Sequence, residues 1–315
     1  MSTSAARPPR RFGVLGTGYW ARWCHGAALA AHPDVELVGF WGRDPERADA
    51  AAAGAGGRGF ADVDELLDAV DAVTFALPPD VQAPLAVRAA RAGRHVLLEK
   101  PVALDLAAAD AVLAATRGAG VASVVDVTYL FQPDITGWID RLRALAAEHG
   151  PWEGALVRWG GSIDAPGSPF GDSPWRRRHG GLWDAGPHAL SVVLSLLPPV
   201  ERVSAAHGVR DAVTVLAEHA GGASSALALT GTAPPGIGGP TAVVWGPGGR
   251  HEMPWFTGTP QEGFARAVDA LREAAATGRE HPTGAADGRD AVAVLAAVDE
   301  HLARPTGERS TPVRR

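Results

Sequence analysis

The sequence predicts an α/β protein with a doubly wound parallel sheet, followed by an α+β domain with a large open, mainly antiparallel sheet. Two observations lead to this prediction. Through residues 11–126, short apolar runs alternate with alanine-rich stretches of helical periodicity, which is typical of βαβ units. Later apolar runs follow one another across glycine and proline turns, which favours antiparallel pairing. We place the domain boundary after residue 126, giving domains 1–126 and 127–315.

The first domain is expected to alternate strands and helices in chain order. Apolar runs that stop at turns predict strands at 11–15, 35–41, 72–77, 95–98 and 121–126. Apolar and alanine residues at helical spacing predict helices at 19–31, 45–53, 63–67, 81–92 and 107–117. Asp105 is a good N-cap for the last of these helices.

The second domain is expected to be rich in strands. The pattern predicts strands at 152–160, 200–209, 211–218, 224–230 and 241–245. Helices are predicted at 135–147, 182–197, 264–276 and 287–302. Residues 162–179 look irregular and could cover a substrate, and the last ten residues look unstructured.

Composition excludes several classes of function. The net charge is -6 and the arginines are spread along the chain, so no basic stripe favours nucleic acid. The apolar runs are far shorter than the ~18 residues of a membrane span. Cys24 is the only cysteine, so it cannot form a disulfide within the chain, and we interpret it as a buried apolar residue. We expect a cytoplasmic protein without membrane partners.

A glycine loop follows the first strand and opens the first helix. Its residues are Gly16-Thr17-Gly18-Tyr19-Trp20-Ala21. Gly16 permits a tight turn, Gly18 lets the backbone approach a pyrophosphate, and the small Ala21 allows helix and strand to pack closely. The loop therefore predicts a dinucleotide site, with a plain βα turn as the alternative.

The tip of the second strand bears on which dinucleotide binds. NAD binders usually carry an acidic residue there, whereas an arginine suits the 2′-phosphate of NADP. Here the tip is Gly42, followed by Arg43 and Asp44. We therefore expect NADP, held by Arg43, with NAD as the alternative if Asp44 turns toward the ribose.

Two further motifs carry chemistry. Lys100, in Glu99-Lys100-Pro101, stands at the exit of a buried strand, where a surface charge is badly placed and an active-site lysine is well placed. Asp184 and His188 are four residues apart, so a helix would put both side chains on one face. Because a proline suits only a helix's first turn, Pro187 predicts a helix start near Asp184.

In this order the motifs resemble the glucose-fructose oxidoreductase and inositol dehydrogenase family, Gfo/Idh/MocA. The run 71–79, with Leu77 and Pro78, and the pair Trp175-Arg176 also match. The resemblance implies a dinucleotide-binding Rossmann domain and a second domain for substrate binding and oligomerisation. It also implies a nicotinamide cofactor and a sugar, polyol or related substrate. Cofactor contacts are expected from the glycine-loop residues Gly16, Gly18, Tyr19, Trp20 and Ala21, and from Arg43, Leu77, Pro78, Glu99 and Lys100.

The chain departs from the family pattern at two places. Relatives often have a histidine where this chain has Gln82, and many carry arginine in the segment around Tyr129, which here has none. Specificity is expected to differ accordingly. Tyr129, Trp175, Arg176 and Trp183 are the candidate substrate contacts, and for the tryptophans plain packing is an equal alternative.

The resulting hypothesis is an NAD(P)-dependent oxidoreductase of the CH–OH/C=O type. His188 would be the general acid/base, Lys100 a charged donor to the same substrate oxygen, and Asp184 would orient His188 or bind a neighbouring hydroxyl. An imine reductase, an NAD-dependent glycosidase and a non-catalytic nucleotide or sugar sensor remain alternatives. An open sheet needs cover, so we expect a homodimer or homotetramer. No histidine has acidic or thiolate neighbours at ligand spacing, so no metal site is predicted.

Overall fold

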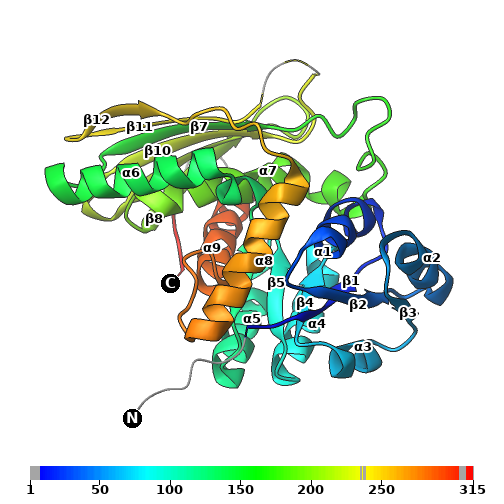
Figure 1. Ribbon diagram of the computed structural model, residues 1–315. Helices are drawn as coiled ribbons and strands as arrows, with labels where there is room; N and C mark the ends of the chain where they lie inside the picture. The colour runs from blue at the N-terminus through cyan, green and yellow to red at the C-terminus, as the bar shows by residue number, and fades with distance from the viewer. Residues whose placement is uncertain (1–7, 235, 237–238, 305–309, 315) are drawn as a thin grey trace, which may run out of the picture. The chain divides into compact units, whose positions relative to one another are not determined.

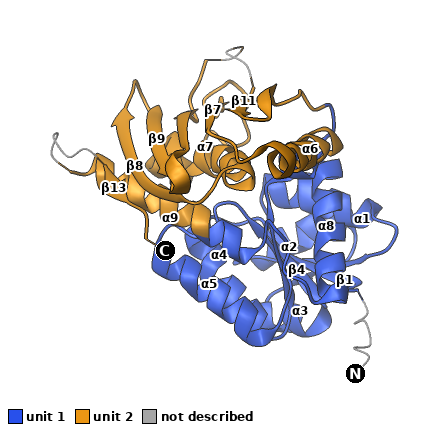
Figure 2. Ribbon diagram, turned by 90° about the vertical axis from the view of Figure 1, so that its left-hand side faces the viewer, with its two compact units in different colours: residues 1–132, 257–289 blue, residues 133–256, 290–315 orange. Residues whose placement is uncertain are grey.

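The computed structural model describes residues 8–234, 236, 239–304 and 310–314, which form two compact units (Figure 2). Unit 1 contains residues 1–132 and 257–289, and unit 2 contains residues 133–256 and 290–315. Each unit is built around its own sheet (Figure 1). The domain boundary after residue 126 stays a prediction.

Unit 1 contains a parallel sheet, which confirms the predicted fold class. Its strand order is β3-β2-β1-β4-β5-β6, and every pair of neighbours is parallel. Order reverses between β1 and β4, as in doubly wound folds. The strands are β1 (Arg11–Leu15), β2 (Glu36–Trp41), β3 (Arg58–Phe60), β4 (Ala72–Phe75), β5 (His95–Glu99) and β6 (Ser123–Asp126).

Strand β3 was not predicted because three residues show no periodicity. It pairs with β2 at Gly39, where a side chain would collide with the carbonyl oxygen of Arg58. The Arg58 guanidinium in turn lies 4.1 Å from the centre of the Phe60 ring. A glycine on one strand and a cation–π pair on the other therefore form this sheet edge.

Five helical connections join these strands as predicted, with one difference in winding. The predicted helix 19–31 begins as a π-helix, η1 (Ala21–Gly26), and continues as α1 (Ala27–Ala31). Asp105 is confirmed as an N-cap, since its carboxylate accepts a 2.8 Å hydrogen bond from the N–H of Ala108. The other connections are α2 (Pro45–Ala55), α3 (Val63–Ala69), α4 (Pro79–Arg91) and α5 (Leu106–Ala119).

Two further helices of unit 1 differ from the prediction. The short η2 (Thr128–Phe131) was not predicted, and α8 (Pro260–Thr277) was predicted as 264–276 within the second domain.

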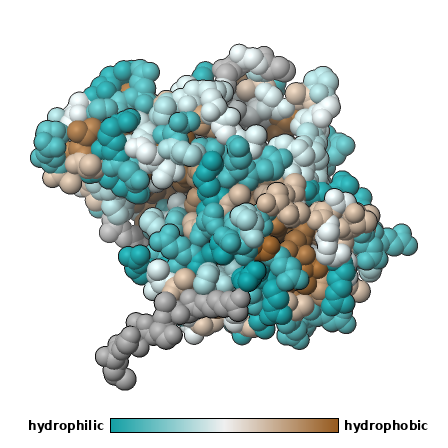
Figure 3. Space-filling model, viewed as in Figure 1, coloured by the Kyte–Doolittle hydropathy of each residue, from teal (hydrophilic) through white to brown (hydrophobic). Residues whose placement is uncertain are grey.

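One apolar core holds η1, α1 and α8 against this sheet. Cys24 belongs to it, as predicted, together with residues such as Phe12, Phe40 and Phe264. In Figure 3 hydrophilic residues cover most of the visible face, and a hydrophobic patch lies where Figure 1 draws α1 and β2. Val35, just before β2, and Leu37, on β2, lie partly buried against the core.

Unit 2 contains a mixed sheet in the order β12-β11-β7-β10-β9-β8-β13. Among its described strands, β7 and β10 pair in parallel and the other neighbours are antiparallel, which confirms the mainly antiparallel prediction. The strands are β7 (Gly154–Gly160), β8 (Val200–His207), β9 (Val213–His219), β10 (Ser224–Thr230), β11 (Thr241–Gly246), β12 (Gly249–Glu252) and β13 (Thr311–Pro312).

Strand β13 corrects part of the expectation for the last ten residues. Thr311 pairs with Val203 and is fully buried, so 311–312 are ordered by pairing with β8. Residues 306–309 and 315 lie outside the described residues. A two-residue strand gives no sequence pattern, so only the partner strand reveals it.

The helices of unit 2 include a long one that differs from its prediction. Helix α7 (Pro174–Leu196) consists of two helical stretches that meet at Gly180, whose φ of 59° is not helical. The first stretch was not predicted, so the irregular segment ends at Ser173 and not at His179. The second stretch confirms the helix predicted at 182–197, but the predicted start near Asp184 is wrong, because Pro187 lies beyond the first turn. The others are α6 (Pro133–His149), η3 (Ala220–Gly222) and α9 (Ala285–Leu302), within which the unit boundary lies. Among helices of described residues, none is long and apolar enough to cross a membrane.

Candidate active site

The glycine loop after β1 has one crowded and one open glycine. Gly16 has a φ of 129°, and a side chain on it would collide with the carbonyl oxygen of Ala76. A Cβ on Gly18 would meet no atom within 4 Å. Gly16 therefore makes the turn, whereas Gly18 leaves open space beside the backbone. Such space is what a dinucleotide pyrophosphate needs at this loop, so the residues fit that ligand.

The residues after the tip of β2 are Gly42, Arg43 and Asp44. A Cβ on Gly42 would lie 2.7 Å from a methyl of Thr17 in the loop, so the residue there has to be small. Asp44 caps α2, since its Oδ1 accepts hydrogen bonds from the N–H groups of Glu46 and Arg47. Arg43 is exposed between them.

Lys100 follows β5 directly and is half-buried. It is the only lysine among the 315 residues, and all other basic side chains apart from histidine are arginine. The residue count of the sequence alone carries this signal. A lone lysine at the carboxyl edge of a parallel sheet is well placed to contact a ligand.

The carboxylate of Glu99 is held by two residues from the start of the first helix. Its Oε1 accepts a 2.5 Å hydrogen bond from the indole N–H of Trp20 and lies 3.2 Å from Nε2 of the buried His25. His25 Nδ1 lies 3.1 Å from the hydroxyl oxygen of Thr74 on β4. Because a carboxylate only accepts, a proton on Nε2 of His25 satisfies both contacts. The residue next to Lys100 is thereby tied to the glycine loop through Trp20.

Asp126 lies beside Glu99 because the two are partners in the β5–β6 register. Its side chain is buried, its Oδ2 lies 3.2 Å from the Thr128 hydroxyl, and its Oδ1 has no hydrogen-bond partner. Burial raises the pKa of Asp126 well above its usual value. The Glu99 charge raises this pKa further, while the Thr128 hydrogen bond and the Lys100 charge lower it.

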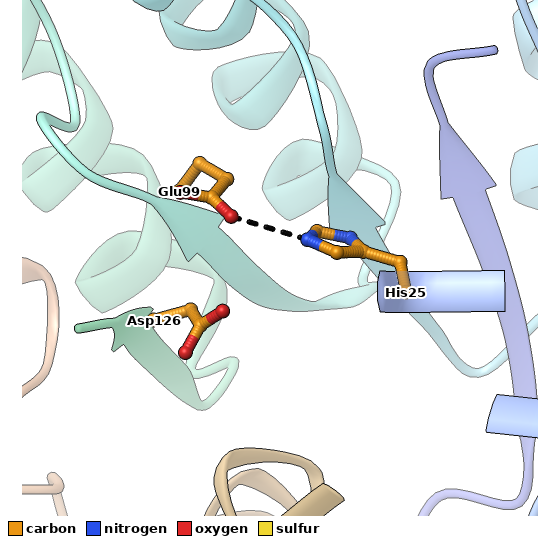
Figure 4. Close-up of side chains that lie close together, drawn as sticks. All are labelled: His25, Glu99 and Asp126. Atoms are coloured by element: carbon orange, nitrogen blue, oxygen red, sulfur yellow. Dashed lines mark hydrogen bonds and ion pairs between the residues drawn. The ribbon is translucent and has the colours of Figure 1, made fainter. Parts of the chain in front are cut away.

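His25, Glu99 and Asp126 also have the donor types and closeness of a metal site (Figure 4). Their ligand atoms lie within 4.8 Å of one another, a cluster that sequence spacing did not reveal. Glu99 Oε1 already accepts two hydrogen bonds, from Trp20 and His25. The Asp126 carboxyl contacts Thr128 instead. We therefore interpret the trio as a hydrogen-bonded His25–Glu99 pair with the Asp126 carboxyl beside it.

Other predicted cofactor and substrate residues of unit 1 lie near the strand ends. Leu77 and Pro78 connect β4 to α4 and are half-buried. Tyr19 is exposed and stacks on Trp23, with ring centres 5.4 Å apart. Tyr129 is buried in η2. Burial also raises the pKa of the Cys24 thiol far above its usual value, helped by the charges of Asp126 and Glu99, so this cysteine is no nucleophile.

In unit 2, α7 carries both predicted residues of the second motif. The His188 ring stacks on Trp159 of β7, with ring centres 5.1 Å apart and planes 12° apart. Sequence reasoning missed Trp159, because nothing local links a strand tryptophan to a helix histidine. Gly181 lets α7 approach β10 closely, since a Cβ on this residue would lie 2.5 Å from the Cα of Thr230.

Asp184 accepts a 3.3 Å hydrogen bond from Nε of Arg176, one helical stretch earlier. The Arg176 guanidinium also lies over the rings of Phe170 and Trp175, at 4.6 and 4.7 Å from their centres. Charge and aromatic contacts together hold this arginine. Trp183 is buried, and its indole N–H donates a 2.6 Å hydrogen bond to Asp299.

Comparison with known proteins finds a family match for part of the first unit. Residues 10–127 match the model of the Gfo/Idh/MocA oxidoreductase family, described by its NAD-binding Rossmann fold. The resemblance inferred from the sequence motifs is confirmed for this segment.

Relatives with known names extend this likeness. The chain is 33% identical over 196 residues to dTDP-3,4-didehydro-2,6-dideoxy-α-D-glucose 3-reductase of Streptomyces antibioticus, and the aligned segment covers 61% of this chain and 58% of the relative. It is 30% identical over 195 residues to galactose 1-dehydrogenase of Pseudomonas fluorescens, and that alignment covers 60% of this chain and 58% of the relative. The chain thus spans less than two thirds of the length of these relatives.

Solved structures show that the fold extends over the whole chain. GenD2 from gentamicin A biosynthesis, solved in complex with NAD, superposes with a TM-score of 0.81 at 23% identity. The superposition covers 100% of this chain and 98% of GenD2. At this identity the likeness shows the fold alone.

Proposed function

We propose that the protein is an NAD(P)-dependent oxidoreductase that acts on a carbonyl or hydroxyl carbon of a sugar, polyol or related small molecule. One observation carries the proposal: the only lysine of the chain follows β5 beside a carboxylate that is hydrogen-bonded to the glycine loop. A fixed ammonium at the carboxyl edge of a dinucleotide-binding sheet suits the stabilisation of a developing alkoxide.

The cofactor we propose is NADP, with NAD as the alternative. The glycine loop, with Gly16, Gly18, Tyr19, Trp20 and Ala21, would form the cofactor site with Gly18 beside the pyrophosphate. Further contacts would come from Arg43, Leu77, Pro78, Glu99 and Lys100. Two features support NADP: Arg43 is exposed at the strand tip, and the Asp44 carboxylate is already used as a helix cap. When bound, the nicotinamide exchanges a hydride with the substrate carbon.

The chain's own residues would handle the proton. We assign His188 as general acid/base, with its ring held on Trp159, and Lys100 as a charged donor to the substrate oxygen. Asp184, which is engaged by Arg176, would bind a neighbouring hydroxyl or orient the histidine. Trp175, Tyr129 and Trp183 remain candidate substrate contacts.

The substrate class and assembly rest on different observations. Both named relatives act on hexose derivatives, which supports a sugar or sugar derivative here. Leu156 and Leu216 are more than half exposed on strands of unit 2, which supports a homodimer or homotetramer that covers this sheet face. We expect the protein to work in the cytoplasm.

The test is to incubate the protein with NADPH or NADH and a panel of keto-sugars, aldehydes and cyclic imines while absorbance is followed. Oxidation of the cofactor by a keto-sugar or aldehyde, faster with NADPH, supports the proposal. Turnover of imines alone would point to an imine reductase. If nothing is reduced, glycoside hydrolysis with bound NAD is assayed next, and its absence favours a sensor.

A further inference from the structure

Gln82 contacts the backbone on either side of Lys100. It lies in the first turn of α4 and its side chain is fully buried. Its Oε1 accepts a 2.8 Å hydrogen bond from the N–H of Glu99. Its Nε2 lies 2.8 Å from the carbonyl oxygen of Glu99, 3.2 Å from that of Pro101 and 3.3 Å from that of Val102. We call residues 99–102 the Lys100 turn.

The Lys100 turn needs such a partner because it leaves the sheet. The β5–β6 ladder ends with Glu99 opposite Asp126, so the next residues have no strand beside them. Pro101 has no N–H to offer in any pairing. Buried carbonyl groups are costly to leave without hydrogen bonds. The Gln82 carboxamide, which has one acceptor oxygen and two donor hydrogens, supplies the backbone hydrogen bonds that a neighbouring strand would otherwise make.

A second set of contacts holds the same turn through the side chain of Glu99. Trp20 and His25 hold the Glu99 carboxylate, while Gln82 holds its backbone. Glu99 is therefore restrained at both its main chain and its carboxylate. The position and direction of the Lys100 backbone, which follows it, are restrained as a result. A shift of about 1 Å at a reacting group can cost about a hundredfold in rate.

We propose that Gln82 is the positioning residue of Lys100: its carboxamide fixes the backbone on both sides of the lysine and so sets where the ammonium group points. Gln82 acts through the main chain and touches neither cofactor nor substrate in this role. The part of this inference that concerns turnover rests on the proposed function, in which Lys100 donates to the substrate oxygen.

The single lysine allows a direct test without turnover. Protein labelled with 13C only in lysine gives one Cε resonance, and that resonance belongs to Lys100. In Gln82→Met, which keeps the side-chain length but removes all four contacts, this resonance should shift or split. The matched control is Gln132→Met, because Gln132 is a second buried glutamine of unit 1 that contacts Thr259 and Arg266 instead. It should leave the lysine resonance unchanged.

The same variants are then compared in turnover. Gln82→Met should lower kcat about tenfold to a hundredfold while the Kd for NADPH or NADH changes less than about threefold. Gln82→His, with one donor and one acceptor, should recover part of the loss and serves as the readout if the methionine variant does not fold.

The proposal is overturned by an unchanged lysine resonance in folded Gln82→Met or, if only the histidine variant folds, by a parent-like resonance and kcat in Gln82→His. An equal change in Gln132→Met also overturns it. If the parent turns over no substrate, the proposed function fails, and the resonance alone decides the role of Gln82.

Discussion

The Lys100 turn in unit 1 and the Asp184/His188 face of α7 in unit 2 are held by different kinds of contact. Around Lys100, hydrogen bonds from Gln82, Trp20 and His25 fix the end of β5 and the residues that leave it. On α7 the helix fixes the backbone, and aromatic rings restrain the side chains of His188 and Arg176. Hydrogen bonds are directional and stacking tolerates small shifts, so substitutions in unit 1 should cost more.

The largest effect is expected from the lysine itself. Lys100→Met should lower kcat about a hundredfold to a thousandfold, because a donor to the developing alkoxide is lost. Lys100→Arg should not restore the rate, since a planar guanidinium cannot replace a compact ammonium. Steady-state kinetics measure both, and cofactor titration by fluorescence should show Kd within about threefold of the parent. Unchanged turnover would remove Lys100 from the mechanism.

The two loop glycines should respond to alanine in opposite ways. Gly16→Ala should lower the free energy of unfolding by about 1–3 kcal/mol, because its φ and its contact with Ala76 leave no room for a side chain. Gly18→Ala should change that free energy by less than about 0.5 kcal/mol, since its Cβ would lie in open space. We expect Gly18→Ala instead to weaken cofactor binding. Urea unfolding measures the change in stability, and NADPH titration measures the change in cofactor binding. If Gly18→Ala is destabilised as much as Gly16→Ala, the interpretation that Gly18 lies beside open space is wrong.

The aromatic contact in unit 2 should give a smaller effect. Trp159→Leu removes the ring under His188 and should lower kcat about threefold to tenfold, as expected from the ~0.5–1.5 kcal/mol of an aromatic pair. Trp159→Phe keeps a ring and should lose less. Trp255→Leu is the control, because this exposed tryptophan stacks only on its neighbour Phe256 among the described contacts. Equal rates in all three variants would show that the stack does not restrain His188.

The last effect is on stability and not on turnover, and it is a pH dependence at Asp126. Its pKa is raised in the folded state, so its contribution to stability is complete below the unfolded value of about 3.9 and is lost as pH rises through the folded pKa. Asp126→Asn stays neutral, so its Tm relative to the parent should rise as the pH increases above about 4 and level off once the folded carboxyl ionises. Asp68→Asn, exposed on α3, controls for loss of a carboxylate. A constant difference in Tm across this range would mean that Asp126 is ionised when folded.

The sequence predicted the features that local pattern carries. Each predicted strand of the parallel sheet overlaps an observed one, and β1 matches at both ends, because a buried strand between turns has an unmistakable run of apolar residues. The glycine loop and Lys100 were found for the same reason, since each sits directly after such a run. The Asp105 cap follows from a single residue type at a helix start.

Features that depend on partners distant in sequence could not be predicted. His25 and Glu99 are 74 residues apart, and Glu99 meets Asp126 only through strand register. Trp159 and His188 come from a strand and a helix. The error at Pro187 had another cause: a general preference for proline in first turns was applied to a helix that continues through it. Gln82 and Glu99 are also far apart, at 17 residues, so nothing local in the sequence indicated what Gln82 contacts.

Having one lysine also determines how this protein reacts with amine-directed chemistry. Cross-linkers, biotinylation reagents and activated surfaces that target amines can attach only to the chain's α-amino group or to Lys100. If the proposed function holds, modification of Lys100 by such a reagent should stop turnover. Protection of Lys100 by an added nicotinamide cofactor would then report that the cofactor is bound.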